Sequence, residues 1–342
     1  MEKDLISIII PLYNAEKYIK KNIDELLLQT YQNFEIIIVD DGSTDNSYKV
    51  VNDNYKTQIN SGKIKIIKQD NFGAPAARNK GMEIAKGEYY IFLDADDYYS
   101  KEAIEKLHNA IVEGKKDLVV SNISMVDKNG KLIEKNAYSN KKDNYNLERV
   151  EFYLYSEIPL GKIYRASIIK EYNIKWENLR ARQDTNFYYK FICCTDKILF
   201  IDDNTGYYRI LENSIAHSKN LNLLDLEKSL SGIEKFCKIH NLYEQYKDYL
   251  VISKIQKYSA NLTNCINDYN NKHYRQFIIY FFKQRLKKIN LDETNLNSSQ
   301  KKELKKIMSK AIIKASFPRL FRAYSKIKRR IFKWRLQELK MQ

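Results

Sequence analysis

Four short apolar runs in the first hundred residues alternate with polar and amphipathic stretches. The runs are Leu5–Ile10, Phe34–Val39, Ile64–Ile67 and Tyr89–Leu93. An uninterrupted apolar run of this length predicts a strand that is buried on both faces. Ile19, Ile23 and Leu26, between the first two runs, are spaced as on one face of a helix. The alternation predicts an α/β fold with a right-handed, mostly parallel mixed sheet and flanking helices.

Polar residues follow each run, where a strand of the predicted sheet ends. They are Pro11–Asn14, Asp40–Ser43, Gln69–Asn71 and Asp94–Asp97. Because an open α/β sheet binds its ligands beyond the carboxyl ends of its strands, these segments are predicted to line one site. A further apolar run at Asp117–Val120 leads to Lys128–Lys131, whose Asn-Gly pair predicts a hairpin and a change to antiparallel pairing.

The pattern changes after residue 220. From Leu221 the sequence is compatible with long helices, has no glycine after Gly232 and has one proline, Pro318. We therefore predict an α/β domain over residues 1–220 and an all-helical C-terminal domain over residues 221–342. A length of 342 residues fits two units, because a single core rarely grows that large.

The composition fits a folded protein with an anionic partner. The chain has 59 Lys and Arg against 43 Asp and Glu, a net charge of +16, which favours a nucleotide, a nucleic acid or an acidic membrane face without choosing among them. No apolar run approaches the ~20 residues that cross a bilayer, and the N-terminus does not resemble a signal peptide, so we expect a cytoplasmic protein. Four cysteines without CxxC spacing are expected to be reduced thiols.

The acidic segment Asp94-Ala95-Asp96 ends a predicted buried strand. Two carboxylates one residue apart at a chain reversal can approach one divalent cation, and hard oxygen ligands suit Mg²⁺ or Mn²⁺ shared with phosphates. Such an ion would neutralise charge on a leaving diphosphate. The alternative is that these residues cap the next helix, a position that Asp favours.

Two further segments follow predicted strands. In Asp40–Asp45 an acidic side chain can accept hydrogen bonds from a base or a ribose, and Gly42 permits a tight turn; a helix cap at Ser43 or Thr44 is the alternative. In Gly73–Gly81 small residues open a helix and bring Arg78 near its positive end, which suits contacts with phosphate or a base.

Four segments together resemble the family 2 inverting glycosyltransferases of the GT-A fold. They are Ser7–Asn14, Val39–Asp45, Ala77–Gly81 and Phe92–Asp97, in that order. The resemblance covers about residues 5–215. It implies a Rossmann-like GT-A domain that binds a nucleotide sugar at residues 1–220, and it makes an isolated helix cap a poor account of the acidic pair.

The resemblance also implies roles for individual residues. Donor-binding residues would be Pro11, Tyr13 and Asn14 beside the nucleoside, Asp41 on the uracil, Arg78 near the base or phosphates, and Asp94 on the ribose and metal shell. Asp96 would bind Mn²⁺ or Mg²⁺ directly. Further along, Gly206–Ile210 and Asn213–Ser218 resemble the segment that closes over the diphosphate, so that Arg209 would contact phosphate and His217 the metal or the phosphates.

The catalytic base of the family lies in a Glu-Asp pair that opens a helix with aromatic residues. This chain has Gln183-Asp184 followed by Thr185–Tyr188, so the Asp is kept and the Glu is replaced. Asp184 suits the role, because a carboxylate opposite the leaving diphosphate can take the proton of an attacking hydroxyl. A helix cap is again the alternative.

The C-terminal residues 311–342 interleave large apolar side chains with about ten Lys and Arg. Three interpretations stay open: an interfacial helix on an anionic membrane, a nucleic-acid surface, which we do not expect, or a helix that packs on this protein or on a second copy of it. Pro318 kinks or breaks the segment in each case.

The expected function is an inverting transfer of a sugar from a UDP-sugar to a hydroxyl of a bacterial surface glycan. The acceptor would be a glycan or lipid-linked glycan of a capsule, lipopolysaccharide, teichoic acid or glycoprotein. The alternatives are a nucleotidyltransferase that makes the sugar nucleotide and an inactive scaffold that binds it. Against the first, Pro11–Asn14 stands where a Gly-rich basic loop would follow the first strand; against the second, Asp94, Asp96 and Asp184 are retained.

Overall fold

The computed structural model describes residues 1–137, 157–211, 222–268 and 272–316, and these form two compact units. The first unit contains strands β1–β9 and helices α1–α8, and the second contains helices α9–α11. The division into domains at residue 220 stays a prediction, since α8 (Asn222–Ile239) groups with the first unit by its contacts.

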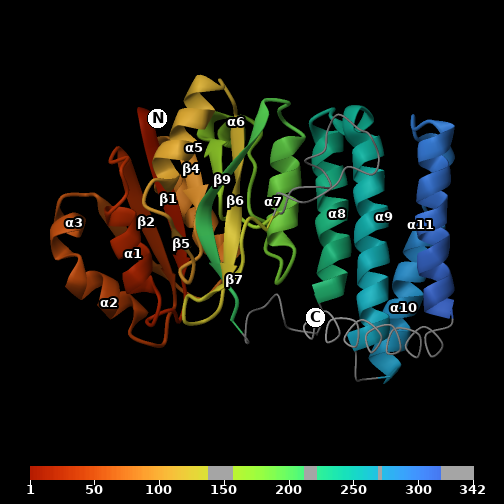
Figure 1. Ribbon diagram of the computed structural model, residues 1–342, viewed down its shortest axis with the longest axis horizontal. Helices are drawn as coiled ribbons and strands as arrows, with labels where there is room; N and C mark the ends of the chain where they lie inside the picture. The colour runs from red at the N-terminus through yellow and green to blue at the C-terminus, as the bar shows by residue number, and fades with distance from the viewer. Residues whose placement is uncertain (138–156, 212–221, 269–271, 317–342) are drawn as a thin grey trace, which may run out of the picture. The chain divides into compact units, whose positions relative to one another are not determined.

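One nine-stranded mixed sheet forms the centre of the first unit (Figure 1). Its strand order is β3-β2-β1-β4-β8-β6-β9-β5, with β7 paired to β6. The strands are β1 (Glu2–Leu12), β2 (Phe34–Asp41), β3 (Ile64–Gln69), β4 (Gly87–Phe92), β5 (Tyr98–Tyr99), β6 (Leu118–Val126), β7 (Leu132–Glu134), β8 (Lys162–Arg165) and β9 (Ile198–Arg209). The first four are parallel, and β8 joins β4 and β6 in antiparallel pairing. The predicted mixed α/β sheet is confirmed.

The predicted hairpin is also present. Strands β6 and β7 pair antiparallel, and Gly130 turns the chain between them with φ +86°. The Asp127 carboxylate fixes this turn by accepting hydrogen bonds from the amides of Asn129 and Lys131, both at 2.9 Å. The parallel strands therefore give way to antiparallel pairing in the part of the chain where the sequence indicated it.

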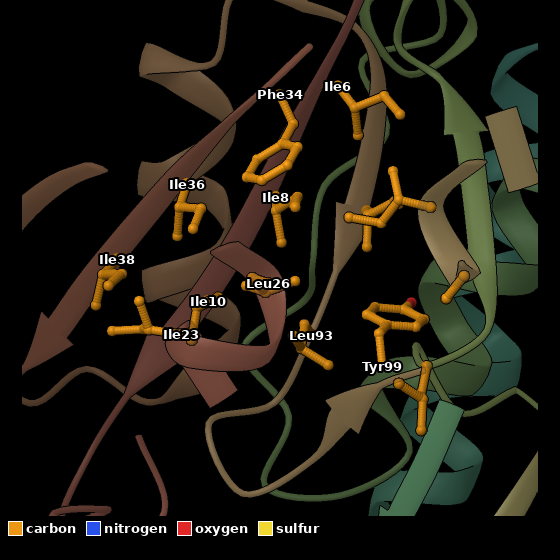
Figure 2. Packing of buried hydrophobic residues seen from close by; sticks show 14 of the residues in the cluster. Ile6, Ile8, Ile10, Ile23, Leu26, Phe34, Ile36, Ile38, Leu93 and Tyr99 are labelled. Carbon is orange, nitrogen blue, oxygen red and sulfur yellow. The ribbon is translucent and has the colours of Figure 1, made fainter. Parts of the chain in front are cut away.

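Helices cover both faces of the sheet. They are α1 (Ile19–Leu27), α2 (Ser47–Asn54), α3 (Lys56–Asn60), α4 (Ala74–Ile84), α5 (Ala103–Glu113), α6 (Ala166–Glu171) and α7 (Gln183–Ile192). On one face, Ile23 and Leu26 of α1 pack with Ile8, Ile10 and other buried strand residues in a core that also takes side chains from α2 and α5 (Figure 2).

The opposite face of the sheet is covered at close range by α4, which contacts β1 and β2. A Cβ added at Gly81 would lie 2.5 Å from Ile9 Cγ2, so only glycine allows this helix to approach so near. The glycine of the Ala77–Gly81 segment therefore has a packing role, and it fixes the position of Arg78, one turn earlier on the same helix.

The prediction that all four apolar runs are buried on both faces is wrong for one of them. Strand β1 is buried from Leu5 onward, and β2 and β4 are buried along almost their whole length, but β3 is mostly half-buried. The reason is its place at the end of the sheet, where only β2 pairs with it. Lys65 and Lys68 on this strand are accordingly within reach of solvent.

All secondary structure among the described residues of the second unit is helical, as predicted. It comprises α9 (Tyr243–Asp268), α10 (Lys272–Lys287), the short 3-10 helix η3 (Leu291–Glu293) and α11 (Ser298–Ser316). Helix α9 contacts both α10 and α11. Its core includes Ile252, Ile255, Leu262, Phe282 and Leu304. Among the described helices, none is long and apolar enough to cross a membrane.

Candidate active site

The register of the parallel strands brings the predicted site segments together at one edge of the sheet. Leu12 at the end of β1 is opposite Asp40 of β2, and Asp41 is opposite Gln69 of β3. On the other side of β1, Ile9 is opposite Phe92, two residues before Asp94. Four loops that are far apart in the sequence therefore start from neighbouring strand ends.

Asp41 holds the loop that follows β3. Its Oδ1 accepts hydrogen bonds from Gln69 Nε2 at 2.7 Å and from the Phe72 amide at 2.9 Å. Its Oδ2 accepts one from the Gly73 amide at 2.8 Å. This carboxylate is buried and already has three donors from its own chain, so its first task is to shape the edge of the site.

Asn14 has a similar task on the neighbouring loop. Its backbone is left-handed, with φ +48°, and its Oδ1 accepts hydrogen bonds from the amides of Thr44 at 2.8 Å and Asp45 at 3.3 Å. Gly42 also has a positive φ, +73°, and a Cβ there would lie 3.0 Å from the Asn71 amide. We call Asn14, Asp41 and the loops that they bind the loop cluster. Pro11 is buried beneath it, and Tyr13 is 48% exposed at its surface.

The turn that contains Asp94 and Asp96 is held from below by α1. Asn22, which is 1% exposed, donates from Nδ2 to the carbonyl oxygens of Asp94 at 3.0 Å and Asp97 at 2.8 Å. Asp97 in turn accepts a hydrogen bond from the Arg209 amide at 2.8 Å. The backbone of the turn is thus fixed, while the side chains of Asp94 and Asp96 are half-buried.

Arg209 is committed to backbone groups. It is 6% exposed, its Nε donates to the Asp96 carbonyl at 3.0 Å, and its Nη1 donates to the carbonyls of Asp127 at 3.3 Å and Lys128 at 2.9 Å. These bonds tie the acidic turn to the β6–β7 hairpin. The predicted phosphate contact would have to use the N–H groups of Arg209 that remain, so this geometry favours a positioning role.

Arg78 joins the acidic turn to the predicted base. Its guanidinium is 2% exposed, Nη2 forms an ion pair with Asp94 Oδ1, and Nη1 lies 3.8 Å from Asp184 Oδ1. Arg78 Cζ also lies 4.4 Å from the centre of the Trp176 ring. We call Asp94, Asp96 and Asp184, together with Arg78, the carboxylate cluster.

Helix α7 carries Asp184 in its first turn and is buried from Thr185 to its end. Phe187 of this helix packs edge-on against Phe92 of β4 at 5.2 Å, which fixes the helix to the strand that leads into the acidic turn. Asn186 donates to the Ser229 carbonyl of α8 at 3.0 Å. The aromatic residues after Asp184 are therefore the anchor that brings it to the cluster.

Burial and neighbouring charge shift the titration of these carboxyl groups. Burial raises the pKa of Asp184 to about 6; Arg78 and Lys162 lower it, while Asp94 and Glu157 raise it. Burial, followed by the charge of Asp94, raises the pKa of Asp96 to about 6. The pKa of Asp97 is raised well above its usual range by the same two kinds of cause. A site with several crowded carboxylates favours a cation.

Asp94 and Asp96 fit a divalent cation as a pair of hard oxygen ligands. The charge of one already disfavours ionisation of the other, and a bound cation would remove that cost. Among the described residues no group of three or more His, Cys, Asp or Glu could hold a metal ion. A cation here would take its other ligands from phosphate oxygens and water, as Mg²⁺ commonly does.

Two positions of the prediction lie outside the described residues. His217 is one, so its proposed contact with metal or phosphate stays a prediction. Residues 317–342, which make up most of the basic C-terminal stretch, are the other. Of the cysteines, Cys193 and Cys237 are buried free thiols and Cys194 is a partly buried one, as expected.

The sequence alone did not single out three residues that shape the site. Asn22 could have been found, because it is a polar residue beside Ile19 and Ile23 on the apolar face of α1. Trp176 gave no local signal, since its partners lie on α4 and α7. Lys162 is fully buried and donates from Nζ to the Ile158 carbonyl at 2.5 Å, and only the tertiary structure brings its charge near Asp184.

Comparison with known families and proteins gives consistent matches. Residues 7–172 match the family described as glycosyl transferase family 2. Glycosyltransferase GlyG of Streptococcus pneumoniae serotype 4 is 31% identical over 251 residues, which cover 69% of this chain and 79% of the relative. The poly(ribitol-phosphate) beta-glucosyltransferase of Bacillus spizizenii is 33% identical over 209 residues, 60% of this chain but only 32% of that protein.

Solved structures support the fold. Residues 1–349 of TarS from S. aureus, crystallised in complex with UDP-GlcNAc, match with a TM-score of 0.57 over 91% of this chain and 81% of theirs. The identity is 21%, so this likeness concerns the fold alone.

Proposed function

Since the chain belongs to glycosyl transferase family 2, we propose that it is an inverting glycosyltransferase, dependent on a divalent cation, that moves a sugar from a UDP-sugar to an acceptor hydroxyl. The observation that carries the proposal is the position of Arg78. One buried guanidinium contacts Asp94 on the donor side and lies 3.8 Å from Asp184. Arg78 thereby brings the proposed cation-binding pair close to the proposed base, and the mechanism requires the two to be close together.

Asp184 is the proposed catalytic base. In an inverting transfer the acceptor hydroxyl loses its proton to the base while its oxygen forms a bond to the anomeric carbon, and the bond from that carbon to the diphosphate oxygen breaks. A pKa of about 6 leaves Asp184 mostly ionised at neutral pH and still basic enough to accept the proton efficiently. The fixed helix start limits the directions from which a hydroxyl can reach it.

The donor side has to stabilise negative charge on the departing nucleotide. Asp94 and Asp96 would hold Mg²⁺ or Mn²⁺, which would supply charge neutralisation on the diphosphate. Asn22 and Arg209 keep the backbone of the acidic turn in place through its carbonyl oxygens. The rigid turn lets the carboxylates bind without reorganisation when charge develops.

The donor and acceptor classes are proposed from the relatives. TarS was crystallised with UDP-GlcNAc, and the Bacillus relative is named for transfer to poly(ribitol-phosphate). We therefore propose a UDP-sugar as donor, with Pro11, Tyr13, Asn14 and Asp41 beside the nucleoside. The proposed acceptor is a hydroxyl of a bacterial surface glycan, free or linked to a lipid. A polyol phosphate of the teichoic acid class is the first acceptor to try.

A donor-hydrolysis panel tests this function. The purified chain is incubated with UDP-GlcNAc, UDP-glucose, UDP-galactose and UDP-GalNAc, with Mn²⁺, Mg²⁺ or a chelator, and UDP is measured. We expect UDP from one donor, in the presence of a cation only. Release of pyrophosphate from a sugar phosphate and UTP would support a nucleotidyltransferase instead. Tight UDP binding without turnover on any donor, even with a poly(ribitol-phosphate) acceptor present, would support a scaffold.

We also propose that residues 311–342 attach the enzyme to the cytoplasmic face of an anionic membrane. Their interleaved basic and large apolar residues are typical of an interfacial helix. Sedimentation with vesicles of phosphatidylglycerol should recover the full chain but not the chain truncated after residue 310. Equal recovery of both would refute this attachment. Self-association of the full chain without vesicles would favour packing between copies.

A further inference from the structure

We infer that Trp176 is a positioning residue whose indole ring holds the Arg78 guanidinium between Asp94 and Asp184. The segment before α7 would then set the separation between the donor side and the base. This inference rests on the proposed function, because it assigns to one side chain a share in the proposed chemistry.

The backbone of Trp176 is fixed to α4 by a single side chain. Asn79 Nδ2 donates to the Trp176 carbonyl at 2.8 Å, and Asn79 Oδ1 accepts from the Trp176 amide at 2.9 Å. The backbone amide and the carbonyl of Trp176 are thus both bound by Asn79, the residue that follows Arg78. The indole ring is consequently tied to the helix position next to the guanidinium that it faces, although 97 residues separate the two segments along the chain.

The ring itself is held in a stack of aromatic groups. Trp176 is nearly parallel to Phe187 of α7, with ring centres 4.2 Å apart and an interplanar angle of 8°. Phe92 of β4 packs edge-on against Trp176 at 5.0 Å. Trp176 is 3% exposed and Arg78 is 2% exposed, so the ring and the guanidinium are closely surrounded. The same ring thus contacts the helix that carries the base and the arginine that faces it.

Hydrogen bonds from described residues do not by themselves fix Arg78. Its Nη2 binds Asp94, but its Nε and Nη1 have no hydrogen-bond partner among the residues that the structure describes. The 3.8 Å between Nη1 and Asp184 Oδ1 is too long for a hydrogen bond. A guanidinium held at one nitrogen can pivot, and stacking on an aromatic face opposes this. Trp176 supplies that face 4.4 Å away.

The test compares Trp176→Leu with Trp176→Phe, which keeps an aromatic face. A matched control is Phe34→Leu, because Phe34 is 3% exposed and has Lys63 Nζ 3.3 Å from its ring centre, but starts β2 at the other end of the strand from the site. Turnover is measured with the UDP-sugar that the wild type hydrolyses fastest. It is divided by the number of sites that bind UDP in calorimetry, so that misfolded protein does not count.

We expect Trp176→Leu to lower kcat per UDP-binding site about tenfold or more, with KM for the donor within about threefold of the wild type. Trp176→Phe should stay within about threefold of the wild-type kcat. Phe34→Leu should lose thermal stability without a comparable loss in kcat per site. Equal kcat per site in Trp176→Leu and Phe34→Leu, or no rescue by the phenylalanine, would overturn the inference.

A double-mutant cycle with Arg78→Lys separates a positioning role from a general loss of structure. If Trp176 acts through Arg78, adding Trp176→Leu to Arg78→Lys should change kcat by less than about twofold. Full additivity would refute the inference.

Should Trp176→Leu fail to fold, Asn79→Ala provides a second test, with the same expected fall in kcat and nearly unchanged KM. A wild type that releases no UDP from any donor would refute the proposed function itself, whereas an active wild type with additive effects would refute only the role of Trp176.

Discussion

The loop cluster and the carboxylate cluster lie at the same edge of one sheet, yet they differ in how far their buried polar groups are hydrogen-bonded. In the loop cluster, Asp41 accepts three hydrogen bonds and Asn14 accepts bonds from two successive amides. In the carboxylate cluster, Asp184 Oδ1 and two nitrogens of Arg78 are buried with no hydrogen-bond partner among the described residues. One region is complete by itself, and the other has capacity left for a ligand.

The difference separates shape from chemistry. Buried polar groups are normally paired, and leaving one unpaired costs about 1–3 kcal/mol, so unpaired groups gather where a function needs them. The loop cluster uses its polar atoms to hold loops in the form that a nucleoside would meet. In the proposed function, the unpaired atoms of the carboxylate cluster would meet the charge of a substrate. Substitutions in the two regions should therefore fail in different ways.

The largest effect is expected for Asp184→Asn. Loss of the base should lower kcat by ~10³, while UDP affinity stays near that of the wild type. Turnover and calorimetry on the same preparation measure the two quantities. The control is Asp196→Asn, because Asp196 is an exposed residue shortly after the end of α7; its kcat should stay near that of the wild type. Retention of more than about a tenth of the activity would remove Asp184 from the mechanism.

Asp96→Asn should have the next largest effect. Weakened cation binding is expected to lower turnover about a hundredfold, since a cation contributes several kcal/mol to stabilising the leaving group. A Mn²⁺ titration should show that more metal is needed for half-maximal rate. Asp53→Asn, an exposed carboxylate in the last turn of α2, should leave the titration unchanged. Wild-type turnover that survives a chelator would contradict the proposed cation.

The pH dependence should be smaller, about tenfold per unit at the acid end. Since the base must be ionised, kcat should fall below the Asp184 pKa of about 6 and level off above it.

Stability should change with pH in the opposite direction, because a raised pKa means that the folded state disfavours the charged form of Asp184. The wild type should lose stability relative to Asp184→Asn as pH rises from about 4 to 6, and no further above. Urea unfolding of both proteins across this range measures the difference in their free energies of unfolding. A wild type that gains stability relative to Asp184→Asn as pH rises would contradict the raised pKa of Asp184.

The smallest kinetic effect is expected in the loop cluster, for Asp41→Asn. The asparagine side chain has one accepting oxygen where Asp41 has two, so one donor, such as the Gly73 amide, is left unpaired. The free energy of unfolding should therefore fall by about 1–3 kcal/mol. KM for the donor should rise severalfold and kcat change little. Thermal unfolding and steady-state kinetics test both parts, with Asp53→Asn again as control. A fall in kcat comparable to that of Asp184→Asn would abolish the distinction between the two clusters.

Much of the parallel half of the fold could be predicted from the sequence. Its strands are short and apolar because both faces are covered, and each is followed by polar residues, as expected where the carboxyl ends of parallel strands open onto a binding site. The exposure of β3 could not be predicted, because its apolar run looks like the others and only the strand order makes it an edge. The assignment of α8 to the first unit was equally hidden, since its contacts are with residues distant in sequence, such as Asn186.

The sequence by itself determined which residues carry charge and at which strand ends they emerge, because alternation, apolar runs and the family segments are local properties of the chain. Only the tertiary structure decided what each of those groups has left to offer. Asp41 and Arg209 are used by loops and carbonyls, whereas Arg78 stands between Asp94 and Asp184 under the ring of Trp176. The physical reason is that a hydrogen bond or an ion pair depends on distance in space, and some of these partners lie more than a hundred residues apart along the chain.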